Sequence, residues 1–300
     1  MTEWDGRGLP PVAQARMQRA AAGRMRTSLL SARESAALGA VGLDPVGEVM
    51  GCVVEHIGWG GYGCGAYFGT GIGRMTYAPP TITSGIGGFA GYAPYVDALY
   101  YGYEVSLHRM LLEAQAVGAD GVVGVRWTQE HLDTNSNREF VALGTAVRAR
   151  SAHRPAHLFA TELPGQDVVK LMHGGWMPSG MVIGIAVAVR HDDYYTRQQA
   201  SAWSNVNTEV AGYTELVTYV RADARVKFAQ RAAKQGGDAA IVSNMAMNVW
   251  SIEPSDGHRD HVAESIVVGT ALAKFHGGAQ VPTDALMMMP LMGTDRRSQK

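Results

Sequence analysis

Residues 118–127 read Gly-Ala-Asp-Gly-Val-Val-Gly-Val-Arg-Trp, and residues 236–242 read Gly-Gly-Asp-Ala-Ala-Ile-Val. Each stretch places a glycine and an aspartate before an apolar run typical of a β-strand. Further along, Gly-Thr-Ala-Val at 144–147 corresponds to Gly-Thr-Ala-Leu at 269–272. Upstream, an offset of 133 residues aligns a third block: Gly42, Pro45 and Gly47 fall on Gly175, Pro178 and Gly180. Because the three blocks occur in the same order, the sequence predicts an internal duplication.

Each predicted copy has the same series of elements. An extended piece ends near Leu30 in the first copy and near Leu163 in the second, and a short helix follows. Strands are predicted at residues 46–57 and 181–190, each followed by a long helix with apolar residues every three or four positions. Two β-rich stretches close each copy. The predicted fold class is therefore α+β, a tandem β-α-β-β module with an antiparallel sheet and one long helix per copy.

Both long helices are predicted to end at a glycine, Gly118 and Gly236, because a left-handed C-cap favours that residue. One helix covers only one face of a sheet of three or four antiparallel strands. The other face needs a partner. We expect the second copy and further chains of the same protein to supply it.

Residues 118–127 and 142–147 together resemble the YbjQ-like family, which carries a heavy-metal-binding label. The family has a long helix followed by a Gly-Ala-Asn-Ala-Val-Val-Gly-Val-Arg-like strand, and a Gly-Thr-Ala-Val strand closes its domain. The resemblance covers residues 28–150 closely and residues 157–276 more loosely. It implies a dodecin-like module and a ring-shaped, pentameric assembly. It supplies no defined set of metal ligands.

Composition limits the functional classes. The formal net charge is −1 and 46% of the residues are hydrophobic, which favours a folded protein without a specific nucleic-acid partner. Two cysteines are too few for a disulfide framework and are typical of a reducing compartment. No apolar run reaches the length of about 18 residues that a membrane span needs. We therefore expect a cytoplasmic protein.

Cys52, His56 and Cys64 are the first candidate ligands for a heavy metal, since thiolate and imidazole suit soft ions. On a strand, Cys52 and His56 would lie about 13 Å apart, too far for one ion unless the strand is broken. A small core thiol and a surface histidine are the alternative interpretation. His191-Asp192-Asp193 and His258-Arg-Asp-His261 are further candidates. The alternative for the first is a polar loop that opens the next helix, and the alternative for the second is a solvated loop.

Residues 58–91 form an insertion in the first copy with 12 glycines and one charged residue, Arg74. A solvated linker would carry more charge and fewer aromatic residues. We expect this loop to pack against neighbouring subunits or to line a central opening; a floppy loop is the alternative. Its candidate contact residues are Trp59, Tyr62, Tyr67, Phe68, Tyr77 and Phe89.

The segments outside the two copies are an arm, residues 1–27, and a tail, residues 277–300. Six arginines and two acidic residues occur up to position 33, so the arm is basic. A helix is predicted over residues 12–25 with Arg16, Arg19 and Arg24 pointing outward, where it could dock a partner such as an acidic protein or RNA. A frayed terminus is the alternative.

The sequence contains none of the common phosphate-binding or catalytic motifs. We therefore expect a non-enzymatic, homo-oligomeric assembly or scaffold protein that forms rings. The alternative is a heavy-metal or small-molecule binding protein whose sites lie at subunit junctions. An enzyme with a site between subunits is a third interpretation.

Overall fold

The computed structural model describes residues 4–6, 8–22, 27–58, 81–83, 92–132, 137–152, 155–201, 207–255 and 258–275. The arm contributes one helix, α1. The remaining elements fall into two halves, residues 32–149 and residues 159–274, and a short strand, β2 (Thr81–Thr83), lies in the insertion.

The first half contains a short helix, a strand, a long helix and two further strands. The strand pairs β1–β4 and β3–β4 are antiparallel. Helix α4 crosses the sheet so closely at Gly51 that an added Cβ would lie 2.0 Å from the backbone oxygen of Ser106, which excludes any larger residue without a shift of the helix. In chain order the elements are α2 (Ala32–Ala40), β1 (Leu43–His56), α4 (Ala93–Ala116), β3 (Gly121–His131) and β4 (Asn137–Ala149).

The second half begins with a two-residue strand that belongs to the sheet of the first half. This strand, β5, pairs in parallel with β3, so the first sheet has the order β1-β4-β3-β5. The second sheet has the order β2-β6-β8-β7, and all its pairs are antiparallel. The elements are β5 (Phe159–Ala160), α5 (Gly165–His173), β6 (Trp176–His191), α6 (Tyr194–Gln199), α7 (Ala211–Lys234), β7 (Ala239–Ser255) and β8 (His258–Lys274).

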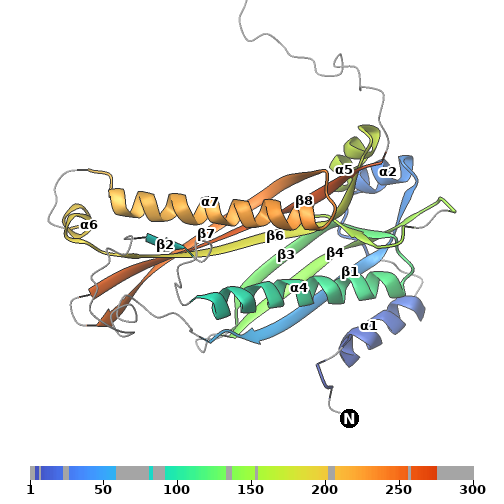
Figure 1. The fold of residues 1–300 in the computed structure, drawn as a ribbon. Coiled ribbons are helices and arrows are strands. Elements are labelled where there is room, and N and C mark those ends of the chain that lie inside the picture. The colour runs from blue at the N-terminus through green and yellow to red at the C-terminus, as the bar shows by residue number, and fades with distance from the viewer. Residues whose placement is uncertain are drawn as a thin grey trace, which may run out of the picture.

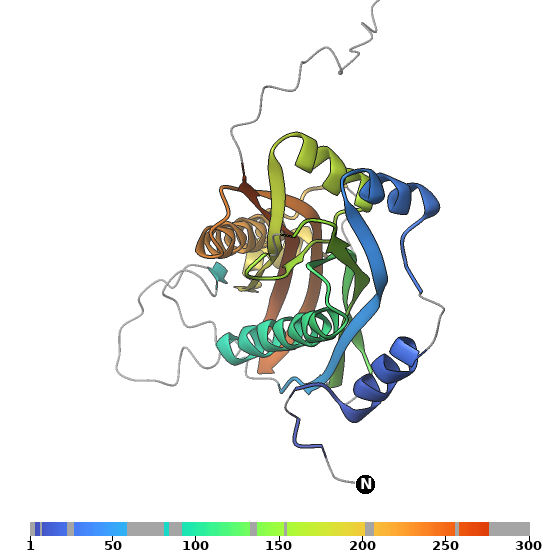
Figure 2. The ribbon, with the colours of Figure 1, turned by 90° about the vertical axis from the view of Figure 1, so that its right-hand side faces the viewer.

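Sheets and long helices alternate in layers. Figure 1 shows α7 on one side of the long strands β6 and β8 and α4 on the other, and Figure 2 shows the same order from the end. Apolar side chains of α4, including Leu99 and Tyr103, share a core with Ile185 and Ile266 of the second sheet. The face of that sheet towards α7 packs on Val220, in a separate core. Helix α4 is therefore covered from two sides.

Several predictions about local structure are confirmed. The helices α4 and α7 are followed by Gly118 and Gly236 with φ of 69° and 73°, the left-handed conformation that was expected. The sheets are antiparallel apart from the β3–β5 pair, which the sequence did not indicate. Strands β1 and β6 begin before Pro45 and Pro178, and each proline sits at a register shift, where a missing N–H is tolerated.

One prediction about the N-terminal region is corrected. The extended piece predicted near Leu30 is not part of a strand among the described residues, whereas β5 ends three residues before Leu163. Helix α1 (Pro11–Ala22) forms, but Arg16 does not point outward: it forms an ion pair with the buried Glu113. Charge compensation of a buried carboxylate explains this inward orientation. Arg24 lies outside the described residues.

Among the helices in the described part of the chain, none is long and apolar enough to cross a membrane.

Candidate assembly surface

Strand β7 lies at the edge of the second sheet. On one side, β7 pairs with β8 from Ala239 to Ser255. On the other side, no strand pairs with it in the described part of the chain. Val242 and Val249 on this strand are 48% and 50% exposed. A long edge strand with exposed apolar side chains is a ready template for pairing with another strand.

Strand β3 of the first half is covered on both sides. It pairs with β4 on one side, and the chain around β5 pairs with it on the other. Thr161 N donates to Val122 O at 3.0 Å, and Val125 N donates to Thr161 O at 3.0 Å. Val122 and Val123 are fully buried. Strands β3 and β7 both follow a long helix and a Gly-x-Asp turn, but among the described residues only β3 has a neighbour at this edge.

The outermost layers of the fold also carry exposed apolar residues. Helix α7 exposes Tyr219 and Val226, and β1 exposes Val54. The inner helix α4 exposes Tyr101, but the second sheet covers much of it, and Leu99 and Met110 are fully buried. The stack of layers therefore ends in helix α7 on one side and in the first sheet on the other.

A buried polar cluster joins the two halves. The Tyr95 hydroxyl of α4 donates to the Glu264 carboxylate of β8, and Arg138 Nη2 of β4 donates to the Tyr95 hydroxyl oxygen at 2.7 Å. Asn248 Nδ2 of β7 donates to the other Glu264 oxygen at 3.0 Å. Burial, followed by the negative charge of Glu264, raises the pKa of Tyr95. The cluster fixes the register of one half on the other, and no sequence motif indicates it.

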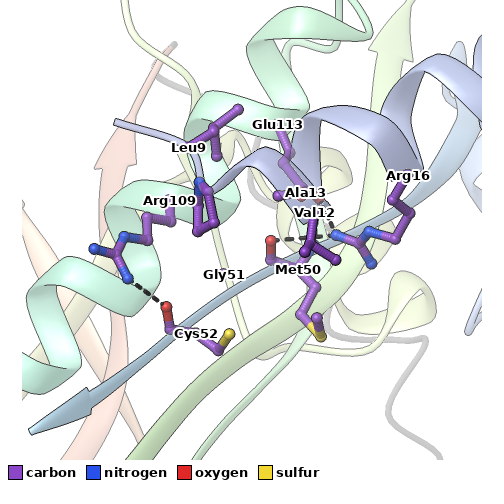
Figure 3. Close-up of a pocket in the computed structure, with 10 residues that line it drawn as sticks. Leu9, Val12, Ala13, Arg16, Met50, Gly51, Cys52, Arg109 and Glu113 are labelled. Carbon is purple, nitrogen blue, oxygen red and sulfur yellow. Dashed lines mark hydrogen bonds and ion pairs between the residues drawn. The ribbon is translucent and has the colours of Figure 1, made fainter. Parts of the chain in front are cut away.

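Of the predicted metal ligands, Cys52 and His56 are described and lie on the same strand, β1. Cys52 lines a cavity of about 130 Å³ (Figure 3). His56 is exposed, and its Nδ1 lies 3.1 Å from Asn137 Oδ1. Among the described residues, no group of three His, Cys, Asp or Glu side chains could hold a metal ion. Cys64 lies outside the described residues, so the set of three stays a prediction.

The same cavity shows how the arm is held (Figure 3). It lies between α1, β1 and α4. Glu113 accepts a hydrogen bond from Met50 N at 2.9 Å and pairs with Arg16. Arg109 donates to Cys52 O at 2.7 Å and to Gly6 O at 3.2 Å. Two side chains of α4 thus bind the arm to the first half.

The structure brings together two histidine motifs that are 70 residues apart in the sequence. His191 Nδ1 lies 2.8 Å from Asp260 Oδ1, and His261 Nδ1 lies 2.9 Å from Asp192 Oδ1, where β6 pairs with β8. The Tyr213 hydroxyl donates to Asp192 at 3.2 Å, and burial together with that carboxylate raises the pKa of Tyr213 to about 12. The antiparallel register explains this meeting, which the sequence alone did not suggest.

The six aromatic residues predicted to form an assembly loop, and most of the insertion with them, lie outside the described residues. The three described residues of β2 pair with Arg190, Val189 and Ala188 of β6 in the same chain. The contribution of the six aromatic residues to contacts between chains stays a prediction.

Comparisons with known proteins place this geometry in context. Residues 69–150 match the family described as "Putative heavy-metal-binding" (YbjQ_1). The chain is 28% identical to the encapsulin nanocompartment protein Rv1762c of Mycobacterium tuberculosis over 290 residues, which cover 94% of this chain and 97% of that protein. It is 39% identical to a UPF0145 protein of Halorubrum lacusprofundi over 71 residues, which cover 23% of this chain and 67% of that protein. Through this matched region, the chain belongs to the UPF0145, or YbjQ-like, family.

Proposed function

We propose that this chain is a non-enzymatic assembly protein, in which copies join head to tail into a closed ring. The carrying observation is the contrast between two equivalent strands: within the described part of the chain, β3 is paired at both edges, whereas β7 has an open edge and exposes Val242 and Val249. A protein that kept such an edge open would risk uncontrolled pairing. A second copy removes that risk.

The two halves are proposed to be tandem copies of one module, because their details agree. Helices α4 and α7 both have 24 residues. Gly42 and Gly175 both have φ of 80° and precede β1 and β6. Asp120 Oδ2 accepts from Ala149 N, and Asp238 Oδ2 accepts from Lys274 N in the same place of the second half.

The relation between the halves can be repeated by another chain. Within one chain, the second sheet packs on α4 and the segment before α5 pairs with β3. The same step, applied once more, puts the first sheet of a second chain on α7. Tyr219, Val226 and Val54 are exposed on the layers that this step would cover. Head-to-tail contacts of this kind close into rings when the rotation permits, and we propose a pentamer.

The similarity to an encapsulin nanocompartment protein supports an assembly role rather than catalysis. We further propose that the assembly is cytoplasmic, since its two cysteines are typical of a reducing compartment.

Light scattering on the purified full chain tests the proposal. We expect a mass several times the 32.1 kDa of one chain, and a lower mass for Val242→Lys, because a charge would be buried without a partner. Tyr195→Lys is the matched control, since Tyr195 is an exposed residue of α6, away from β7. A wild-type chain that stays monomeric would refute the proposal.

The second candidate function is binding of a heavy metal; the observation that favours it lies within one chain, between α1, β1 and α4, and not at a junction between chains. The observation in its favour is that Cys52 and Met50, two sulfur-containing residues of β1, line the same cavity. Elemental analysis after dialysis would show stoichiometric zinc or copper if this function holds. Cys52→Ser would then remove the metal while the mass of the assembly stays the same.

A further inference from the structure

The segment before α5, residues 160–163, has a defined local conformation, and we call it the leading segment of the second half. Thr161 Oγ1 accepts a hydrogen bond from Leu163 N at 3.1 Å, so that a short turn precedes α5. The same hydroxyl lies 2.8 Å from Thr270 Oγ1 of β8. The segment is thereby held on its own half, while its backbone N–H and C=O groups reach β3 of the other half.

Residues 27–30 of the first half repeat this conformation. Ser28 Oγ accepts from Leu30 N at 3.2 Å, the same turn one module earlier. Leu29 N donates to Thr145 Oγ1 at 3.0 Å, and Thr145 occupies the place in β4 that Thr270 occupies in β8. Helix α2 follows at Ala32, as α5 follows at Gly165. The segment is therefore already shaped as a pairing strand.

The two leading segments differ in what covers their outer side. Ala160 and Thr161 are buried against β3. Thr27 and Ser28, at the corresponding positions, are exposed. No hydrogen bond from the Ser28 N–H to a strand occurs in the described part of the chain. One chain thus presents both an unused strand segment and, at β7, an unused strand edge.

We propose that residues 27–30 of one copy add as a parallel strand to the open edge of β7 in a second copy. This contact rests on the proposed function, because it requires an assembly of identical chains. The Ser28 N–H would donate to Ala240 O, and the Ser243 N–H would donate to Ser28 O. These bonds copy those of Thr161 with Val122 and Val125. Strand addition to an exposed edge is a recurrent mode of recognition.

The register of β7 agrees with this pairing. In the first half, β3 shifts register against β4 between Val123 and Arg126. In the second half, β7 shifts against β8 between Val242 and Asn244. The bulge therefore occurs at the same position along both strands. Ser243 of β7 corresponds to Val125 of β3, whose N–H donates to Thr161 O. An unrelated protein strand, or β7 of another copy, is a competing occupant that the experiment separates.

A disulfide between two differently substituted chains tests the contact. The partner of Val122 in β5 is Ala160, so the corresponding pair between chains is Ala240 and Thr27. Neighbouring strands lie about 4.8 Å apart, within the Cα range of a disulfide. Full-length chains carrying Thr27→Cys or Ala240→Cys, both with Cys52→Ser and Cys64→Ser, are mixed under oxidising conditions. Ala160→Cys with Val122→Cys in one chain is the positive control for this geometry.

We expect cross-linked dimers in the mixture and not with either variant alone. A chain with both substitutions should give a ladder of covalent multimers that ends at the ring size. An assembly of normal mass without cross-links would overturn the contact and leave the proposed function standing. Dimers of the Ala240→Cys variant alone would instead indicate β7 paired with β7. A wild-type chain that is monomeric would overturn both the contact and the proposed function.

Discussion

Replacement of Tyr95 by phenylalanine tests the buried cluster that joins the two halves. The hydroxyl makes two hydrogen bonds to charged groups, Glu264 and Arg138. Each such bond contributes roughly 1.5–3 kcal/mol. Glu264 is 1% exposed, so no water can replace the lost donor. Asn248 still donates to Glu264, and we therefore expect Tyr95→Phe to lower the free energy of unfolding by about 3 kcal/mol.

Urea unfolding at fixed chain concentration measures this loss, since stability of an assembly depends on concentration. The control is Tyr101→Phe, an exposed tyrosine on the same helix, for which we expect a change below about 0.5 kcal/mol. Glu264→Gln combined with Tyr95→Phe should cost less than the sum of the two single changes, because both remove one interaction. Equal losses for the two tyrosine variants would refute the reasoning.

Three further predictions follow from single contacts. Gly184→Ala should lower the free energy of unfolding by about 3 kcal/mol in the same urea assay, because the new Cβ would lie 2.3 Å from a backbone oxygen of α7. The control is Gly39→Ala in helix α2. Its new Cβ would lie 3.8 Å from the nearest atom, and we expect it to raise the free energy of unfolding by about 1 kcal/mol. Glu113→Gln weakens the ion pair with Arg16, so trypsin should cleave the arm about tenfold faster, equivalent to 1.4 kcal/mol; an unchanged rate contradicts this. Burial and Asp260 raise the pKa of Tyr92 to about 12. Because the folded pKa of Tyr92 is raised, its contribution to stability is complete below pH about 10 and is lost as the pH rises towards 12. A titration midpoint near pH 10 for the tyrosinate absorbance that Tyr92→Phe removes would contradict this.

The candidate site was only partly predictable. An exposed sheet face in need of a partner followed from one helix per sheet. Which strand stays open did not follow, because the residues of β3 and β7 do not show what lies beside each strand in the folded chain. Cys52 and His56 were predicted on one strand and lie there. Tyr95 and Glu264 were missed because their contact joins residues 169 positions apart.

The sequence by itself determined the local elements: glycines such as Gly118 end the helices because only glycine readily adopts positive φ, and apolar runs place the strands. The tertiary structure decided how these elements are shared between the halves. Strand β5 leaves its own half to complete the first sheet, and α4 is buried on two sides because a second sheet packs on it. Local propensity carries no information about such distant neighbours. The open edge of β7 has the same origin: among the described residues, no segment covers it as β5 covers β3.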